Sequence, residues 1–374
     1  FGPVELEGGR SVAERAEVIA DVSVLGQAAR RMGDLDGDGE NDLVFVRDTG
    51  GADIVSVIFG GPEWPRQLTL DDVDRNVAVS DVVPSSVQVI NWNGDANADL
   101  VLKSSITTYV VDGKAVETGG LPLLTDPISP AGNALATLTD GSGLGAPIAV
   151  GDINGDGLED LLLLGSYDNG NAYLVLGRDD AASIDVTTEA DVVFEDVLDT
   201  EDSFGRNAFA LGDLNYDGYD DLAVSNLAER EQQPAMRVFF GSGDFTTEET
   251  AAVLAADADI RIRRFSAGQL SGGLSVEGTI AATAGDFNAD GAMDLALAEN
   301  GNILTQENTI LDLGTRSRAW VVWNAAEHGD ELVLADAPIQ LRGETELDLE
   351  AWYIGRTLDT LSHIPQLDLN RDGV

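Results

Sequence analysis

The chain has 374 residues, of which 67 are Asp or Glu and 21 are Lys or Arg, giving a formal net charge of −46. This charge argues against nucleic acid as a partner, because binding a phosphate backbone needs a basic footprint. There is no cysteine from which to read a redox compartment. No apolar run reaches the roughly 18 residues of a membrane span, so we expect no membrane insertion.

An acidic pattern first occurs in the segment GDLDGDGENDL at residues 33–43. Acidic side chains stand at positions 1, 3, 5 and 9 of this loop, and a backbone carbonyl is expected at position 7; these residues are Asp34, Asp36, Asp38, Asp42 and, for the carbonyl, Glu40. Ca²⁺ takes six to eight oxygen ligands at about 2.3–2.6 Å, and a tight loop turns alternate positions inward. Glycine at positions 4 and 6 permits the turn. The pattern therefore predicts a calcium loop.

The same register recurs at intervals of 57 to 82 residues, measured between first positions. The predicted ligands of the further complete loops are Asn91, Asn93, Asp95, Asn97 and Asp99; Asp152, Asn154, Asp156, Leu158 and Asp160; Asp213, Asn215, Asp217, Tyr219 and Asp221; and Asp286, Asn288, Asp290, Ala292 and Asp294. A sixth copy begins with Asp368, Asn370 and Asp372 and is cut off, so the last repeat is expected to be incomplete. The second loop has only two carboxylates among these side chains, and we rank it last among the complete loops.

An EF-hand is the first alternative for these loops, but it requires a bidentate Glu at position 12 and flanking helices. Position 12 of the first loop is Phe45, inside the apolar run LVFV. Short apolar runs follow the other complete loops as well, at residues 100–102, 161–164, 222–224 and 295–298. These runs predict buried strands, so the loops are expected to connect strands.

The repeat period near sixty residues indicates one supersecondary unit per copy. Further strand signals that end in glycine occur within the units, at residues 54–61, 173–177 and 237–243. Four short strands per unit are typical of a propeller blade. We predict an all-β propeller of four-stranded blades forming one domain over residues 1–374, with six repeats visible and six or seven blades in the intact ring. The longer late units predict excursions near residues 228–235, 268–278 and 324–350.

Two segments carry most of a known repeat signature, FGRNAFALGDLNYDGYDDLAVS at residues 204–225 and GAPIAVGDINGDGLEDLLLLG at residues 145–165. They resemble the FG-GAP repeats of integrin α-subunit propellers and their bacterial relatives. The resemblance implies that each calcium loop joins the innermost strand of a blade to the second strand. The implied inner strands are residues 28–31, 87–90, 148–150, 208–211 and 281–284. It also implies that residues 4–24 supply an outer strand that closes the ring against the last blade.

No catalytic constellation is recognisable in the sequence. The two histidines, His328 and His363, do not belong to a nucleophile motif, and most of the aspartates are already assigned to metal. We therefore expect the chain not to be an enzyme.

Two features could bind a ligand. Arg261, Arg263 and Arg264 form the densest basic cluster, which could hold a carboxylate or sulfate of an acidic glycan, or could pair with neighbouring acids, the reading we favour. Trp64 could stack on a sugar, although packing between blades is the preferred role for it and for Trp320, Trp323 and Trp352.

The leading hypothesis is a secreted or cell-surface propeller, stabilised by several structural Ca²⁺ ions, that mediates adhesion or recognition. Its expected ligand is an extracellular protein or a polysaccharide, an acidic glycan included, and the chain is expected to be part of a larger polypeptide. One alternative is a propeller-fold carbohydrate-active enzyme such as a polysaccharide lyase. Another is a passive structural module of a larger surface protein.

Overall fold

The computed structural model describes most of the chain and leaves both ends out. The described residues are 19–20, 28–48, 53–61, 67–78, 87–104, 107–118, 133–139, 144–165, 170–179, 182–195, 204–226, 228–230, 233–247, 250–265, 274–277, 280–299, 303–306, 309–312, 318–337 and 339–342. The chain divides into two compact units, Phe1–Ala149 with Gly177–Ala190, and Val150–Leu176 with Asp191–Val374. The single domain over residues 1–374 stays a prediction.

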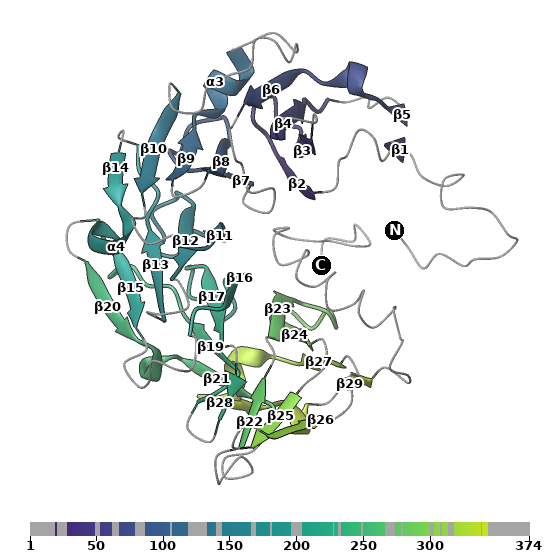
Figure 1. Cartoon of the computed structure of the whole chain (residues 1–374), viewed down its shortest axis with the longest axis vertical. Coiled ribbons are helices and arrows are strands. Elements are labelled where there is room, and N and C mark those ends of the chain that lie inside the picture. The colour runs from purple at the N-terminus through teal and green to yellow at the C-terminus, as the bar shows by residue number, and fades with distance from the viewer. Residues whose placement is uncertain are drawn as a thin grey trace, which may run out of the picture. The chain divides into compact units, whose positions relative to one another are not determined.

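The first unit is built of sheets in which most neighbouring strands are antiparallel (Figure 1). One sheet has the order β2-β3-β4-β6, with strands Ala28–Gly33, Asp42–Asp48, Asp53–Ile58 and Arg75–Ala78. The next has the order β7-β8-β9-β10-β14, with strands Gln88–Ile90, Asp99–Ser104, Thr107–Val111, Ala134–Thr139 and Ala182–Asp185. The short strands β1 (Ile19–Ala20) and β5 (Gln67–Leu68) pair in parallel.

The second unit repeats this plan. One sheet has the order β11-β12-β13-β15-β20, with strands Pro147–Gly151, where the unit boundary falls, Asp160–Leu164, Asn171–Val175, Val192–Glu195 and Ala251–Leu254. The next has the order β16-β17-β19-β21-β28, with strands Asn207–Gly212, Asp221–Ser225, Met236–Phe239, Ile260–Arg263 and Glu331–Val333. The third has the order β23-β24-β27-β29, with strands Ile280–Gly285, Asp294–Glu299, Arg318–Val322 and Ile339–Arg342.

A further sheet comes from the excursions of the late repeats. Its order is β18-β22-β25-β26, with strands Ala228–Glu229, Leu274–Glu277, Ile303–Gln306 and Thr309–Asp312. Two of the predicted excursions, near residues 228–235 and 268–278, supply its first two strands. The strands pair with one another rather than extending a repeat sheet.

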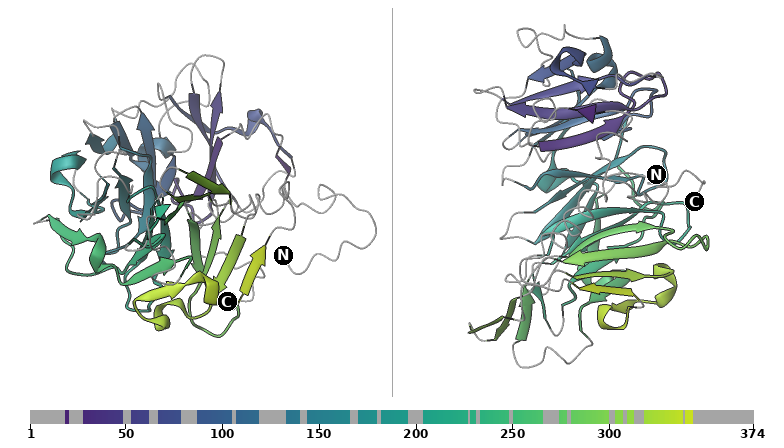
Figure 2. Two further views of the ribbon diagram at one scale, coloured as in Figure 1. Left: turned by 60° about the horizontal axis from the view of Figure 1, so that its bottom comes forward. Right: turned by 90° about the vertical axis from the view of Figure 1, so that its right-hand side faces the viewer.

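Three of the repeat sheets have five strands where the sequence predicts four. The additional strands β14, β20 and β28 each lie between the third and fourth strands of the following repeat. Each pairs in parallel with the outermost strand of the preceding sheet, namely β10, β15 or β21. The added strand covers backbone groups that an edge strand would leave unpaired. Figure 2 shows the ribbon from two further directions, coloured by residue number.

The second strands of the third, fourth and fifth repeats are deeply buried. β12 (DLLLL), β17 (DLAVS) and β24 (DLALAE) are buried at every residue, which explains why these runs are apolar on both faces. In the first unit the core gathers around Leu35, Val44 and Leu100, and in the second around Phe209, Leu297 and Trp320.

Helices are few and short among the described residues. The α-helices are α3 (Gly113–Thr118) and α4 (Val186–Glu189), and the 3₁₀ helices are Leu70–Asp72, Ala255–Asp257, Ala325–His328 and Leu334–Asp336. None of the helices in these parts of the chain has the length and apolar character that crossing a membrane requires.

Candidate metal-binding loops

Each complete acidic loop lies between the first and second strands of its sheet, as predicted. The first strands β2, β7, β11, β16 and β23 coincide with the expected inner strands. The aspartate at position 9 is the first residue of the second strand in every copy, at Asp42, Asp99, Asp160, Asp221 and Asp294. The remaining ligand positions are thus set by the turn between two paired strands. The sixth copy lies outside the described residues.

The side chain at position 1 organises the loop backbone. In the first loop, Asp34 Oδ1 accepts hydrogen bonds from the N–H groups of Gly37 at 2.7 Å and Asp38 at 3.0 Å, and Oδ2 accepts one from Gly39 at 2.8 Å. Asp152 receives the same three bonds in the third loop. In the fourth and fifth loops, Asp213 and Asp286 accept from positions 5 and 6. These bonds fix the orientation of the position 1 carboxylate in each of these four loops.

The backbone of the loops is left-handed at position 4. The torsion φ is +75° at Gly37, +75° at Gly94 and +74° at Gly155, which glycine adopts without strain. Tyr216 and Ala289 hold the same position with φ of +61°. This conformation is unfavourable for a residue with a Cβ, so the fourth and fifth loops carry local backbone strain that loops with glycine at position 4 avoid.

Positions 3, 5 and 7 form a second, repeated set of hydrogen bonds. In all five loops the N–H at position 7 donates to Oδ1 at position 5, at 2.8–3.0 Å, from Glu40, Asn97, Leu158, Tyr219 and Ala292. Where position 3 is asparagine, its Nδ2 donates to Oδ2 of the position 5 aspartate, as Asn93 does to Asp95 at 3.1 Å. The third, fourth and fifth loops have the same asparagine bond. Only the first loop has carboxylates at both positions.

The position 9 aspartate is fully buried and holds the loop to its sheet. Asp42 Oδ2 accepts from Leu35 N–H at 2.7 Å, and its Oδ1 accepts from Gly60 N–H at 2.6 Å. Asp99, Asp221 and Asp294 repeat this pair of bonds, each from position 2 and from the end of the third strand. Position 9 therefore joins three chain segments, a structural role that the ligand pattern alone did not predict.

Burial raises the pKa of three of these carboxyls. The pKa of Asp42 rises to about 6, and those of Asp99 and Asp221 rise to about 7, because burial disfavours the charged form. Backbone N–H donors oppose the rise, and nearby loop aspartates add to it. A bound cation would supply the positive charge that these groups lack.

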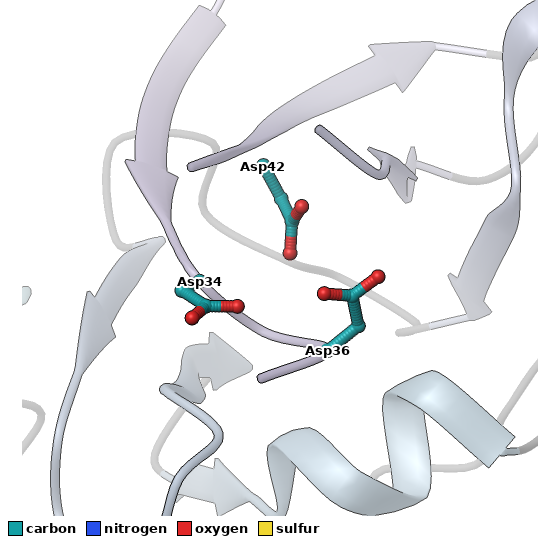
Figure 3. A group of neighbouring side chains, drawn as sticks. All are labelled: Asp34, Asp36 and Asp42. Atoms are coloured by element: carbon teal, nitrogen blue, oxygen red, sulfur yellow. The ribbon is translucent and has the colours of Figure 1, made fainter. Parts of the chain in front are cut away.

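Three carboxylates of the first loop point toward one another (Figure 3). One oxygen from each of Asp34, Asp36 and Asp42 lies within 4.8 Å of the others, and no other described residues form such a group of three acids. Burial, together with the charges of Asp34 and Asp38, raises the pKa of Asp36. Asp38 does not belong to the group. The group fits a hard divalent cation, since all its donors are carboxylate oxygens.

Neighbouring loops within a unit are hydrogen-bonded to each other. Ala98 N–H, at position 8 of the second loop, donates to the carbonyl of Asp34 at 2.6 Å, and Asn97 Nδ2 donates to the carbonyl of Leu35 at 2.7 Å. The N–H of Asp220, at position 8 of the fourth loop, likewise donates to the carbonyl of Asp152 at 2.9 Å. Sequence reasoning missed Asp220 because its role depends on a loop 68 residues away.

The glycines that end the third strands have a specific reason to be glycine. A Cβ on Gly60 would lie 2.3 Å from the carbonyl oxygen of Asn41, one on Gly113 2.0 Å from that of Ala98, and one on Gly241 2.4 Å from that of Asp220. Each of these carbonyls belongs to position 8 of the loop. The strand-ending glycines Gly60 and Gly241 were visible in the sequence, whereas Gly113 and the contacts of all three with the loops were not.

The arginine cluster is engaged in ion pairs rather than open to a glycan. Arg261 pairs with Asp330, Arg263 Nε lies 3.2 Å from Glu331, and Arg264 Nε lies 2.6 Å from Glu299. These ion pairs agree with the favoured interpretation, and the geometry gives no support to the alternative that the arginines bind an acidic glycan.

Trp320, Trp323 and His328, which the sequence analysis singled out, lie among the described residues. Trp320 is buried in the core of the second unit, which agrees with a packing role. Exposed His328 contacts the carbonyl of Trp323 through Nε2 at 2.8 Å. Trp64, Trp352 and His363 lie outside the described residues.

Repeated four- and five-stranded sheets, with an acidic loop after each first strand, define an all-β repeat protein and fit a propeller-like fold. Integrin alpha-11 of Homo sapiens is 27% identical over 170 residues, covering 43% of this chain and 13% of that protein. Integrin alpha-PS2 of Drosophila melanogaster is 29% identical over 153 residues (37% and 11%), and Integrin alpha-D of Homo sapiens is 27% identical over 186 residues (48% and 15%). These matches show that the chain is related, at the family level, to the FG-GAP proteins of the integrin α type.

The other comparisons are more distant. No protein-family model matches the chain. Among solved structures, a crystal structure of BBS1N in complex with ARL6DN has a TM-score of 0.35 at 9% identity, covering 82% of this chain and 90% of that one. The V. cholerae biofilm matrix protein Bap1 has a TM-score of 0.28 at 13% identity, covering 84% and 55%. The chain spans at most 15% of the length of the integrin relatives given above.

Proposed function

We propose that the chain is a secreted or cell-surface β-propeller module that binds structural Ca²⁺ ions and recognises an extracellular protein or polysaccharide without catalysis. The observation that carries the metal part is the loop frame, which is nearly the same in five copies and brings three carboxylates together at Asp34, Asp36 and Asp42. The relationship to integrin α-subunits supports the adhesion part.

The proposed role of the metal is structural. Position 1 fixes the loop backbone and position 9 ties it to the end of the third strand, so an ion held between them would connect three segments of one repeat. The residues that would hold it are those at positions 1, 3, 5 and 9, with the carbonyl at position 7. The ion would neutralise clustered carboxylates and stabilise the folded state by binding to it alone.

Two measurements test this proposal. Thermal unfolding with millimolar Ca²⁺ should occur at a higher temperature than with chelator, and Mg²⁺ at the same concentration serves as the control. Retention on a panel of matrix proteins and of neutral and acidic polysaccharides, with cleavage products assayed in the same wells, tests recognition. Calcium-dependent retention without products is expected. Cleavage products would favour an enzyme, and a calcium-independent melting temperature would contradict the structural role of the metal.

A further inference from the structure

Asp220 contacts the third loop although it belongs to the fourth. It stands at position 8, directly before the buried Asp221. Its N–H donates to the carbonyl of Asp152 at 2.9 Å, and its Oδ2 accepts from the N–H of Asp152 at 2.8 Å. Both backbone polar groups of Asp152, the first residue of the third loop, are therefore held by one residue of the next loop.

Two glycines make room for this contact. Gly151 has φ of +88°, and a Cβ there would lie 2.0 Å from Oδ2 of Asp220. Gly155, at position 4 of the third loop, lies under the ring of Tyr219, and its Cβ would be 2.6 Å from Cε1 of that ring. Positions 7 and 8 of the fourth loop thus contact the third loop at two points. Both contacts occupy space that a Cβ on Gly151 or Gly155 would fill.

The first and second loops share half of this arrangement. Ala98 N–H donates to the carbonyl of Asp34, as Asp220 N–H does to that of Asp152. Ala98 has no side-chain acceptor, so it cannot repeat the second bond. The carboxylate of Asp220 is thus a feature of the third and fourth loops, added to a backbone bridge found in both pairs.

We propose that Asp220 is a positioning residue that couples metal binding in the third and fourth loops. This rests on the proposed calcium binding of the loops. An ion in the fourth loop would fix the backbone at Tyr219 and Asp221, and therefore Asp220 between them. Asp220 would then hold Asp152 in the orientation that presents its carboxylate to the third loop. Because coupling between two sites is reciprocal, an ion in the third loop must favour the fourth equally.

The experiment is a Ca²⁺ titration of the full chain labelled with ¹⁵N-glycine. The amides of Gly157 and Gly218 report the third and fourth loops, and Gly39 in the first loop is an internal reference. Asp213→Ala disables the fourth loop. Where Asp220 is present, we expect Asp213→Ala to weaken the Ca²⁺ affinity measured at Gly157 by about 5-fold or more, the lower end of typical coupling. In the Asp220→Ala variant, adding Asp213→Ala should change the Ca²⁺ affinity measured at Gly157 by less than about twofold, because the coupling contact is gone.

Asp220→Asn is the matched variant, because its side-chain carbonyl can still accept from Asp152 N–H, and it should retain the coupling. It also keeps the proposal testable where Asp220→Ala does not fold. The same loss of affinity in both backgrounds, or no effect of Asp213→Ala on Gly157, would overturn the coupling while leaving calcium binding intact. An absence of any Ca²⁺ response at Gly39, Gly157 and Gly218 would instead overturn the proposed function and the coupling with it.

Discussion

The first and second loops belong to the same unit and have the same strand connection, yet they differ in how they balance charge. In the second loop, Asn93 donates an amide hydrogen to Asp95, so the loop supplies its own partner for that carboxylate. In the first loop, Asp36 and Asp38 occupy these positions, and the charge of Asp38 helps to raise the pKa of Asp36. We infer that an asparagine at position 3 does more than remove a ligand charge, because it also donates a hydrogen bond within the loop.

The two loops also differ in their backbone. Gly39 at position 6 of the first loop has φ of +90° and donates to Oδ2 of Asp34. Ala96 holds that position in the second loop and is not left-handed. Asn91 offers one amide oxygen and no second acceptor, so a bond like that of Gly39 to Oδ2 is chemically impossible there. We therefore expect the first loop to depend on a cation and the second to keep its shape without one.

The largest effect should come from position 9, which is alike in both loops. Asp42→Ala and Asp99→Ala should each lower the free energy of unfolding by about 2–4 kcal/mol without calcium, because two buried N–H groups lose their acceptor. Chemical denaturation in chelator measures this. Equal losses would confirm a shared structural role. A loss below roughly 0.5 kcal/mol would show that the buried bonds contribute little.

An exchange of the position 3 residues should reverse the difference between the loops. Asp36→Asn should weaken calcium binding to the first loop roughly tenfold, since ligand charge tunes affinity. Asn93→Asp should strengthen binding to the second loop and destabilise it in chelator. Calorimetric titration measures both affinities, and chemical denaturation in chelator measures the stability. Asp257→Asn is the control for Asp36→Asn, because it makes the same charge change at an exposed site outside the loops. Equal effects from the control would attribute the result to net charge.

The pH dependence should have opposite signs with and without calcium. The folded pKa values of Asp42, Asp99 and Asp221 lie above the ordinary aspartate value, so the metal-free folded state binds protons more readily than the unfolded state does. Their contribution to stability is therefore present at low pH and is lost as pH rises through about 6 to 7.

Calcium competes with these protons, so its affinity should rise severalfold between pH 5.5 and 7.5, with proton release on binding. Titrations in buffers of different ionisation enthalpy measure the released protons. Binding that is independent of pH over this range would contradict ionisation of these groups on metal binding.

Much of the loop architecture could be predicted from the sequence, because it depends on local spacing. The alternation of ligands, the strand after each loop and the position of Asp42 at a strand start all follow from nearby residues. The fifth strands could not be predicted in this way. β20 pairs with β15, which lies more than fifty residues earlier, and nothing in the short apolar run Ala251–Leu254 indicates that partner.

The contacts between loops could not be predicted from neighbouring residues either. Asp220 looks like one more acid in an acidic loop, and only the position of Asp152 shows what it does. The arginine cluster illustrates the same limit, because its partners Glu299, Asp330 and Glu331 follow more than thirty residues later.

The smallest expected effect concerns backbone strain in the fifth loop. Ala289→Gly should stabilise the protein by up to about 1 kcal/mol, because Ala289 has φ of +61° and glycine adopts this conformation freely. Ala292→Gly, three residues on and without a positive φ, should destabilise by about 0.5–1 kcal/mol. Thermal unfolding of the two variants compares them directly. Destabilisation by both would mean that strain at position 4 is not significant.

We expect the acidic loops to bind calcium and the first loop to bind it most tightly. The most direct measurement is calorimetric titration of the metal-free protein with Ca²⁺, beside the variant Asp34→Asn with Asp36→Asn. We predict several binding events, the tightest of which disappears in the double variant while the weaker ones remain. No heat of binding up to millimolar Ca²⁺, or an unchanged tightest event in the variant, would contradict the account.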